Sequence, residues 1–282
     1  MIPPHVSARQ HLLTLSAAAL LLGVPIVVGI GYLVGGAIGV SGDADGVSLG
    51  RVLRDGAVWR SALLSLWIAG AGTSLALTGA LSIALLLGGA SKIERFARTV
   101  VALPLPVPNV AAAVAVLLLL SQSGWLSRVA AQLHLIATPG EFPALVLDPW
   151  AIGVIATVVW KELPFLALVA VSLQSLRGRA LTDAARTLGA SPSQALRTIT
   201  LPLLLRGMAP SVIAVFVFVL GSLELPLVLA PSSPLALPLL IQERRQSLDA
   251  TSHGEAYLIA LLATGLAVFA ALVHEALRRD EA

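Results

Sequence analysis

Three ionisable residues interrupt long apolar stretches of the chain. Lys161 and Glu162 are adjacent near the middle of residues 149–176. Glu224 stands two residues before Pro226. A charge at the centre of a bilayer costs about 2.5–3.5 kcal/mol on insertion scales, so such side chains face a partner or a wet cavity and commonly mark a transport path. Adjacent helical residues point about 100° apart, so Lys161 and Glu162 are not expected to pair well. All three are candidate pathway residues. Glu224 has an alternative role as a carboxylate held by backbone N–H groups near the proline.

Other chemistries need patterns that the sequence lacks. The phosphate-binding loop G-x-x-x-x-G-K-[ST] is absent, so the chain is not expected to bind ATP in that way. None of the five histidines has a zinc-type partner three or four residues further on. We therefore predict no catalytic residue, no cofactor and no metal site in this chain.

One weak enzyme signal occurs at residues 39–42, where the sequence reads G-x-S-G with Ser41 as the serine. Intramembrane serine proteases carry their nucleophile in this pattern, in the middle of the membrane. Ser41 instead falls at the end of the first apolar stretch, close to Asp43. A span that ends in turn residues explains the pattern better, and the protease stays as a minor alternative.

The composition indicates a membrane protein. Hydrophobic residues make up 57% of the 282 residues and charged residues 12%, whereas soluble domains carry about 25% charged residues. So few charges cannot cover the surface of a soluble globule. The absence of cysteine excludes a disulfide scaffold, and the net charge of +3 is better explained by arginine-rich inner loops than by nucleic-acid binding.

The gaps between charged residues predict six spans, because about 20 apolar residues cross a hydrocarbon core about 30 Å thick. More Lys and Arg residues fall on the side of the N-terminus, which places both termini in the cytoplasm. The expected fold class is an all-α polytopic membrane protein. The predicted spans are residues 10–42, 61–91, 99–127, 149–176, 207–223 with the residues just beyond Glu224, and 256–274.

The loop between the fourth and fifth spans has the most specific local signals. Thr182 can cap a first short helix, and Asp183 is favourable beside its N-terminal dipole. Gly189 suits the position after this helix, because glycine enters the left-handed backbone region without a Cβ penalty. One face of the helix carries Leu181, Ala184, Ala185 and Leu188.

A second short helix is predicted directly afterwards. Ser191 can cap it, with Pro192 in its first turn and Gln194 completing a capping box. Pro202 is expected to start the turn into the fifth span. The result would be a compact amphipathic knob suited to docking a cytosolic partner, or alternatively an amphipathic loop on the bilayer surface.

This loop resembles the E-A-A-x₃-G-x₉-I-x-L-P signature of permease subunits of type I ABC importers. Asp183 takes the place of the usual glutamate. The other matching residues are Ala184, Ala185, Gly189, Ile199, Leu201 and Pro202. On this resemblance, residues 61–282 form the core permease domain of five transmembrane helices with a coupling loop at 177–202. Residues 1–60 form the N-terminal transmembrane helix and the first outer segment.

The resemblance implies a set of partners. Two such permease subunits, identical or homologous, form the translocation pathway in the inner membrane of a prokaryote. Two cytosolic ATPase subunits bind ATP and Mg²⁺, and each receives one coupling helix, here about Thr182–Leu188. A substrate-binding protein delivers the cargo from outside. The chain itself would transmit the motion of the ATPase and catalyse no covalent chemistry.

Two further alternatives stay open. A secondary transporter driven by an ion gradient would use Lys161, Glu162 and Glu224 as relay groups. Within the ABC importers, Trp160 with Pro164-Phe165, and Glu224-Leu225-Pro226, resemble the branch that handles polyamines, ferric iron or thiamine. Branches for sugars or amino acids are the alternative.

Overall fold

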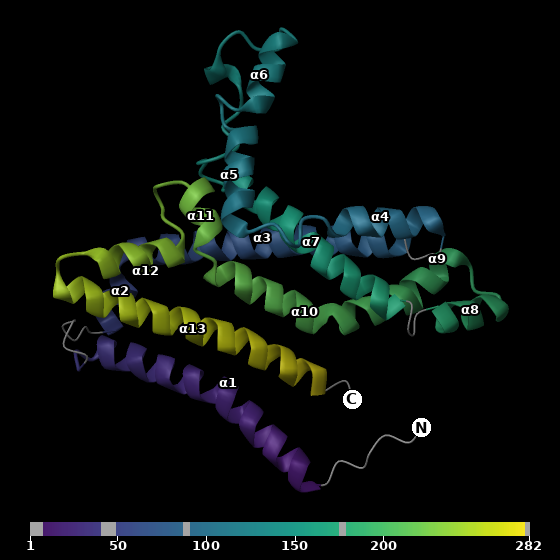
Figure 1. Ribbon diagram of the computed structural model, residues 1–282, viewed down its shortest axis with the longest axis horizontal. Coiled ribbons are helices and arrows are strands. Elements are labelled where there is room, and N and C mark those ends of the chain that lie inside the picture. Colours follow the sequence, from purple (N-terminus) through teal and green to yellow (C-terminus); the bar gives the residue numbers. More distant parts are fainter. Residues whose placement is uncertain (1–7, 41–48, 87–90, 175–178, 280–282) are drawn as a thin grey trace. The chain divides into compact units, whose positions relative to one another are not determined.

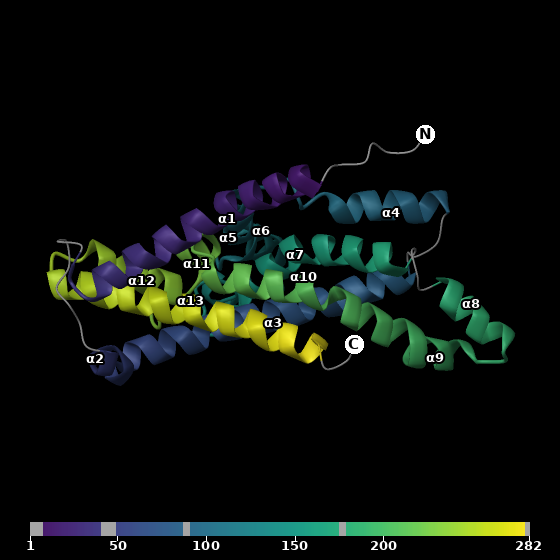
Figure 2. The same ribbon diagram turned by 90° about the horizontal axis from the view of Figure 1, so that it is seen from below.

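The computed structural model describes residues 8–40, 49–86, 91–174 and 179–279 (Figures 1 and 2). The described residues form helices and turns, with no strand among them. The helices are α1 (Ala8–Ala37), α2 (Leu49–Arg54), α3 (Gly56–Leu86), α4 (Lys92–Ala102), α5 (Asn109–Leu120), α6 (Trp125–Gln132), η1 (Pro139–Glu141), α7 (Ile152–Leu173), α8 (Arg179–Thr187), α9 (Pro192–Ala195), the π-helical η3 (Leu196–Thr200), α10 (Leu201–Gly221), α11 (Glu224–Leu229), α12 (Leu237–Gln246) and α13 (Ala250–Arg279).

Among the described residues, six helical segments are long and apolar enough to cross a membrane, which confirms the predicted number of spans and the all-α class. Their helical form satisfies every backbone polar group within the segment once water is absent, and their lengths suit a hydrocarbon core about 30 Å thick. The segments are Ala19–Ala37, Gly56–Leu86, Asn109–Gln132, Ile152–Leu173, Pro192–Gly221 and Ala250–Leu272.

The third span differs from the expected helix over residues 99–127. Helix α4 ends at Ala102, a turn containing three prolines follows, and α5 begins at Asn109. A proline has no N–H and its ring clashes with the carbonyl four residues earlier, so a helix does not continue through this turn. Helix α5 then crosses the direction of α3 and α7 steeply, and α6 follows after a break (Figure 1).

The end of the fifth span also corrects an expectation. Glu224 was predicted to interrupt the span, but α10 ends at Gly221 and Glu224 is the first residue of a separate helix, α11. Pro226 explains the break, because its ring would clash with the carbonyl of Ser222 in a continuous helix. At the third position of α11 the missing N–H costs nothing, since it would have no helical partner there.

The chain forms two compact units. One comprises Met1–Gly56 and Ile241–Leu266, and the other comprises Ala57–Leu240 and Ala267–Ala282. In the first unit, Gly36 of α1 lies against the ring of Tyr257, whose hydroxyl donates to that of Tyr32 at 2.9 Å. The second unit holds the main apolar core, to which α3, α7 and α10 contribute. Each unit is described by itself below.

Helices α3 and α7 approach closely because α3 has glycine at the contact points. A Cβ atom on Gly72 would lie 2.7 Å from Cγ1 of Val158, and one on Gly79 would lie 2.5 Å from Cδ1 of Leu163. Ala76, between these glycines, is fully buried. This contact holds residues 158 and 163 of α7 against α3, and so directs the residues between them toward other neighbours.

We expect Gly72→Val to destabilise the protein by overpacking this contact, which typically costs about 1–3 kcal/mol. Gly70→Val is the matched control, because a Cβ atom there would meet no atom within 4 Å and the loss of backbone freedom is the same. The melting temperature of each purified variant in detergent measures the effect. Equal melting temperatures would show that the two helices do not depend on this close approach.

Candidate functional site

Lys161 lies near the middle of α7 and its side chain is directed at the proline-containing turn between α4 and α5. Its Nζ atom donates hydrogen bonds to the carbonyl oxygens of Pro104, at 3.1 Å, and Leu105, at 3.5 Å, and also to that of Val107. The residue is only 8% exposed. The three N–H groups of the ammonium thus meet three carbonyls of the turn, of which that of Pro104 also accepts from the N–H of Val107 at 3.2 Å.

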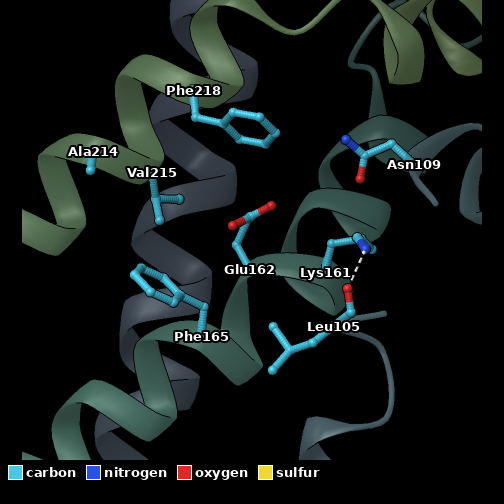
Figure 3. A pocket seen from close by; sticks show the side chains of 8 residues that line it. All are labelled: Leu105, Asn109, Lys161, Glu162, Phe165, Ala214, Val215 and Phe218. Atoms are coloured by element: carbon cyan, nitrogen blue, oxygen red, sulfur yellow. Dashed lines mark hydrogen bonds between the residues drawn. The ribbon is translucent and has the colours of Figure 1, made fainter. Parts of the chain in front are cut away.

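Glu162 is the next residue and points the other way, into a cavity of about 400 Å³ (Figure 3). Among the described residues, none forms a hydrogen bond or an ion pair with its carboxylate. Figure 3 shows the carboxylate on the same side as the rings of Phe165 and Phe218, while the Lys161 ammonium turns toward the carbonyl of Leu105. The cavity is lined by Leu105, Asn109, Lys161, Glu162, Phe165, Ala214, Val215 and Phe218.

The lining comes from α7, α10 and the start of α5, so three helices determine the shape of the cavity. It offers one carboxylate, one neutral amide and two aromatic rings beside the Lys161 ammonium, on an otherwise aliphatic wall. None of the lining residues is a serine, cysteine or histidine. Side chains of these kinds can make ionic, hydrogen-bonding and cation–π contacts.

The N-terminal end of α7 is fixed by a buried carboxylate. Asp148 accepts hydrogen bonds from the backbone N–H groups of Trp150, at 3.0 Å, and Ile152, at 2.9 Å. The indole of Trp67 in α3 donates to the carbonyl oxygen of Trp150 at 2.9 Å. Capping by Asp148 satisfies N–H groups that a helix start would otherwise leave unpaired, and so sets where Lys161 and Glu162 fall along the span.

Several residues of this site were missed by sequence reasoning. Asp148 carried a usable signal, because an aspartate shortly before an apolar run is a common helix cap. Asn109 and Phe218 carried none, since the tertiary fold alone brings α5 and α10 beside α7. The structure does not bring the third predicted pathway residue to this cavity: Glu224 is exposed at the start of α11 and is not part of the lining.

The predicted coupling residues lie on α8, α9 and the start of α10. Helix α8 covers Arg179–Thr187, so Thr182 lies inside the helix and the prediction that it caps the N-terminus is wrong. Its hydroxyl is 3.1 Å from that of Thr200 instead, a hydrogen bond that ties α8 to the π-helical turn. Thr182 and Asp183 also line a small cavity of about 220 Å³ with Arg186.

The end of α8 has the predicted geometry. Gly189 has a φ of +91°, in the left-handed region. Its N–H donates to the carbonyl of Arg186 at 3.0 Å, and the N–H of Ala190 donates to the carbonyl of Ala185 at 3.0 Å. These two bonds form a Schellman motif. The prediction of a glycine cap at this position is confirmed.

The second short helix starts as predicted but continues further. Ser191 and Gln194 form the capping box. Pro202 was expected to start a turn, but it lies in the first turn of α10, and the chain passes from α9 through η3 into α10 without a break. The π-helical turn, in which the N–H of Leu201 reaches the carbonyl of Leu196, accommodates a proline at this place.

The face of α8 that carries Leu181, Ala184 and Leu188 is apolar, and it has no covering partner among the described residues. Leu188 is 89% exposed and Leu181 is 50% exposed, and Ala184 between them is exposed as well, whereas Ala185 is half-buried. The remaining predicted coupling residues lie at the base of α10. Ile199 and Pro202 line a groove of about 830 Å³ together with Leu181, and Leu201 is half-buried.

Six candidate spans, a cavity with a carboxylate on α7 and an amphipathic α8 with an exposed apolar face are features of a membrane transport subunit. The profile of the family described as "Binding-protein-dependent transport system inner membrane component" matches residues 76–280. The chain belongs to this family.

Solved structures support the same fold. The chain resembles a subunit of a bacterial ABC transporter involved in the import of the acidic polysaccharide alginate, with a TM-score of 0.74 and 17% identity over 96% of this chain and 94% of that one. A bacterial alginate ABC transporter in complex with an alginate pentasaccharide-bound periplasmic protein gives a TM-score of 0.71 and 18% identity, over 96% and 93% of the two chains. No curated protein matches the chain in sequence.

Family membership makes the chain a multi-pass membrane component of a binding-protein-dependent transport system. ATP hydrolysis in such a system belongs to a separate subunit. The family thus favours the importer interpretation over the secondary transporter and over the protease. Ser41, on which the protease depended, lies outside the described residues.

Proposed function

We propose that this chain is a permease subunit that couples ATP hydrolysis in two cytosolic ATPase subunits to the passage of a solute between two permease subunits. The observation that carries the proposal is the exposed apolar face of α8, formed by Leu181, Ala184 and Leu188. A cluster of exposed apolar side chains on one helix face is typical of a surface that binds a partner. Helix α8 would occupy a groove on the ATPase, which binds ATP and Mg²⁺, while this chain holds no cofactor of its own.

The attachment of α8 supports a role in transmission. The hydrogen bond between Thr182 and Thr200 joins α8 to the uninterrupted helix from α9 to α10. Toward its C-terminal end, α10 contributes Ala214, Val215 and Phe218 to the wall of the cavity beside Glu162. A pull on α8 would therefore move one wall of that cavity relative to α7. Packed helices shift as rigid elements, since interiors are too dense to absorb the displacement.

The remaining features of the proposal concern the setting of the chain. Both termini and α8 would lie in the cytoplasm, in agreement with the larger number of Lys and Arg residues on that side. A binding protein would deliver the solute to the opposite face. The cavity beside Glu162 would form part of the path, and Lys161 would serve as a structural residue beside it. Glu224, in α11, would face the outer end of the path.

We expect Leu188→Glu and Gly189→Val to impair ATPase docking without preventing membrane insertion. The first variant places a charge on the apolar face, and the second places a β-branched residue at a positive φ, which costs on the order of 1–2 kcal/mol and re-aims the loop. Copurified ATPase subunit and hydrolysis stimulated by the binding protein are the readouts. Asp183→Glu is the control, because it keeps the carboxylate. Normal docking and stimulation in both disruptive variants would refute α8 as the transmission site.

The proposed orientation is tested with single cysteines, since the native chain contains none. Ser193 lies in α9, Ser232 lies between α11 and α12, and both are exposed. In intact cells, an impermeant thiol reagent should label Ser232→Cys directly and Ser193→Cys only after the membrane is opened. Labelling of both positions from the same side would contradict the orientation and the assignment of α8 to the cytoplasm.

A further inference from the structure

We propose that the cavity beside Glu162 selects an organic cation, such as a substituted ammonium, over neutral and anionic solutes. This inference rests on the proposed role of the chain as a permease and adds the chemical class of the solute. It follows from the charges, the rings and the size of the cavity.

The first argument is the charge of the lining. Two ionisable residues border the cavity, Lys161 and Glu162. The three N–H groups of Lys161 are directed at the carbonyl oxygens of Pro104, Leu105 and Val107. Its charge is thus compensated by carbonyl dipoles at the turn, and its hydrogen bonds are not available to a solute. The Glu162 carboxylate is attracted by the charge of Lys161 but has no hydrogen bond or ion pair among the described residues, so its oxygens are left for a solute.

The second argument concerns cost. A carboxylate near the middle of a span is expensive unless something compensates it. Lys161, one residue before, points elsewhere because α7 rotates by about 100° per residue. A cationic solute would supply the compensation, whereas an anionic solute would add a like charge in a medium of low dielectric constant and be repelled.

The third argument separates an organic cation from a metal ion. Phe165 and Phe218 present their rings on the side of the carboxylate (Figure 3). Aromatic faces attract ammonium groups, and the attraction grows when the cation leaves water. Ca²⁺ would need six to eight oxygen ligands, and Mg²⁺ an octahedron of them. The side chains of the lining provide one carboxylate and the Asn109 amide.

The fourth argument is size. A volume of about 400 Å³ lies at the lower end of the range for small-molecule sites, roughly 300–1,000 Å³. Such a space admits one small organic ion with its methyl or methylene groups against the apolar wall. Such an ion would fit without displacement of any side chain. Phe218, at the edge of the cavity, is half exposed.

The test uses the absence of cysteine. Ala214 lines the cavity and is exposed, so Ala214→Cys introduces a single thiol there. The purified permease complex is treated with a cationic reagent, trimethylammonium-ethyl methanethiosulfonate, or an anionic one, sulfonato-ethyl methanethiosulfonate. Each rate is divided by the rate with free 2-mercaptoethanol. We expect the cationic reagent to be favoured, on the order of tenfold for one unpaired charge nearby.

Matched variants identify the source of the preference. Adding Glu162→Gln should abolish it, because the shape is kept and the charge is lost. Adding Glu243→Gln should leave it unchanged, since Glu243 is exposed on α12 and does not line the cavity. Adding Phe218→Leu should lower the rate of the cationic reagent a few-fold and leave that of the anionic reagent unchanged. A thiol at Ser232→Cys should show no preference that depends on Glu162.

Each other outcome overturns the inference. A preference that survives Glu162→Gln would mean that the carboxylate does not set the field, as would a preference for the anionic reagent. No reaction with either reagent would mean that solutes do not enter. An unaltered cationic rate in Phe218→Leu would overturn the assignment to an organic cation. The labelling rates can be measured without transport. A failure of the cation assignment would therefore appear in these rates, whereas a failure of the proposed ATPase docking would appear in the α8 variants.

Discussion

The structure of the second unit, which holds the main apolar core, depends on one constraint. Backbone carbonyls inside a bilayer must find hydrogen-bond donors within the protein. The prolines between α4 and α5 have no N–H group to donate, so the turn holds fewer backbone donors than carbonyls. Lys161 restores the balance by donating to the carbonyls of Pro104, Leu105 and Val107. A lysine near the middle of a span, which is costly in isolation, thus becomes the group that permits the break in the third span.

That interaction in turn defines the cavity. With Lys161 held against the turn, the rotation of the helix directs Glu162 about 100° away from it, where α10 and the start of α5 complete the wall. The contacts of Gly72 and Gly79 with α7 and the Asp148 cap hold α7 in this rotation and at this depth. A carboxylate that no described residue meets with a hydrogen bond or an ion pair is therefore a consequence of how the broken helix is stabilised. Because α10 also continues through η3 and α9 toward α8, the same wall is mechanically linked to the face that we assign to the ATPase.

Much of this fold could be predicted from the sequence, for identifiable reasons. The number of spans follows from apolar length, and the Gly189 and Ser191 caps follow from local chemistry that tertiary contacts do not override. Thr182, Pro202 and Glu224 were misplaced because helix boundaries depend on packing. Pro202 follows a π-helical turn and lies inside α10. Thr182 lies inside α8, because that helix begins at Arg179. The partners of Lys161 lie more than fifty positions away in the chain, and no local pattern reveals them.

Hydrogen–deuterium exchange of a peptide spanning residues 99–112 tests this account most directly, in the wild-type complex and in Lys161→Met. The N–H groups of Leu105 and Val107 are bonded within the turn, to the carbonyls of Ala102 and Pro104 at 3.1 and 3.2 Å. We predict slow exchange in the wild type and markedly faster exchange in Lys161→Met, while peptides from α10 stay unchanged. Lys92→Met, at the exposed start of α4, should exchange like the wild type. Equal exchange of the turn in Lys161→Met and wild type would contradict the claim that Lys161 stabilises the broken helix.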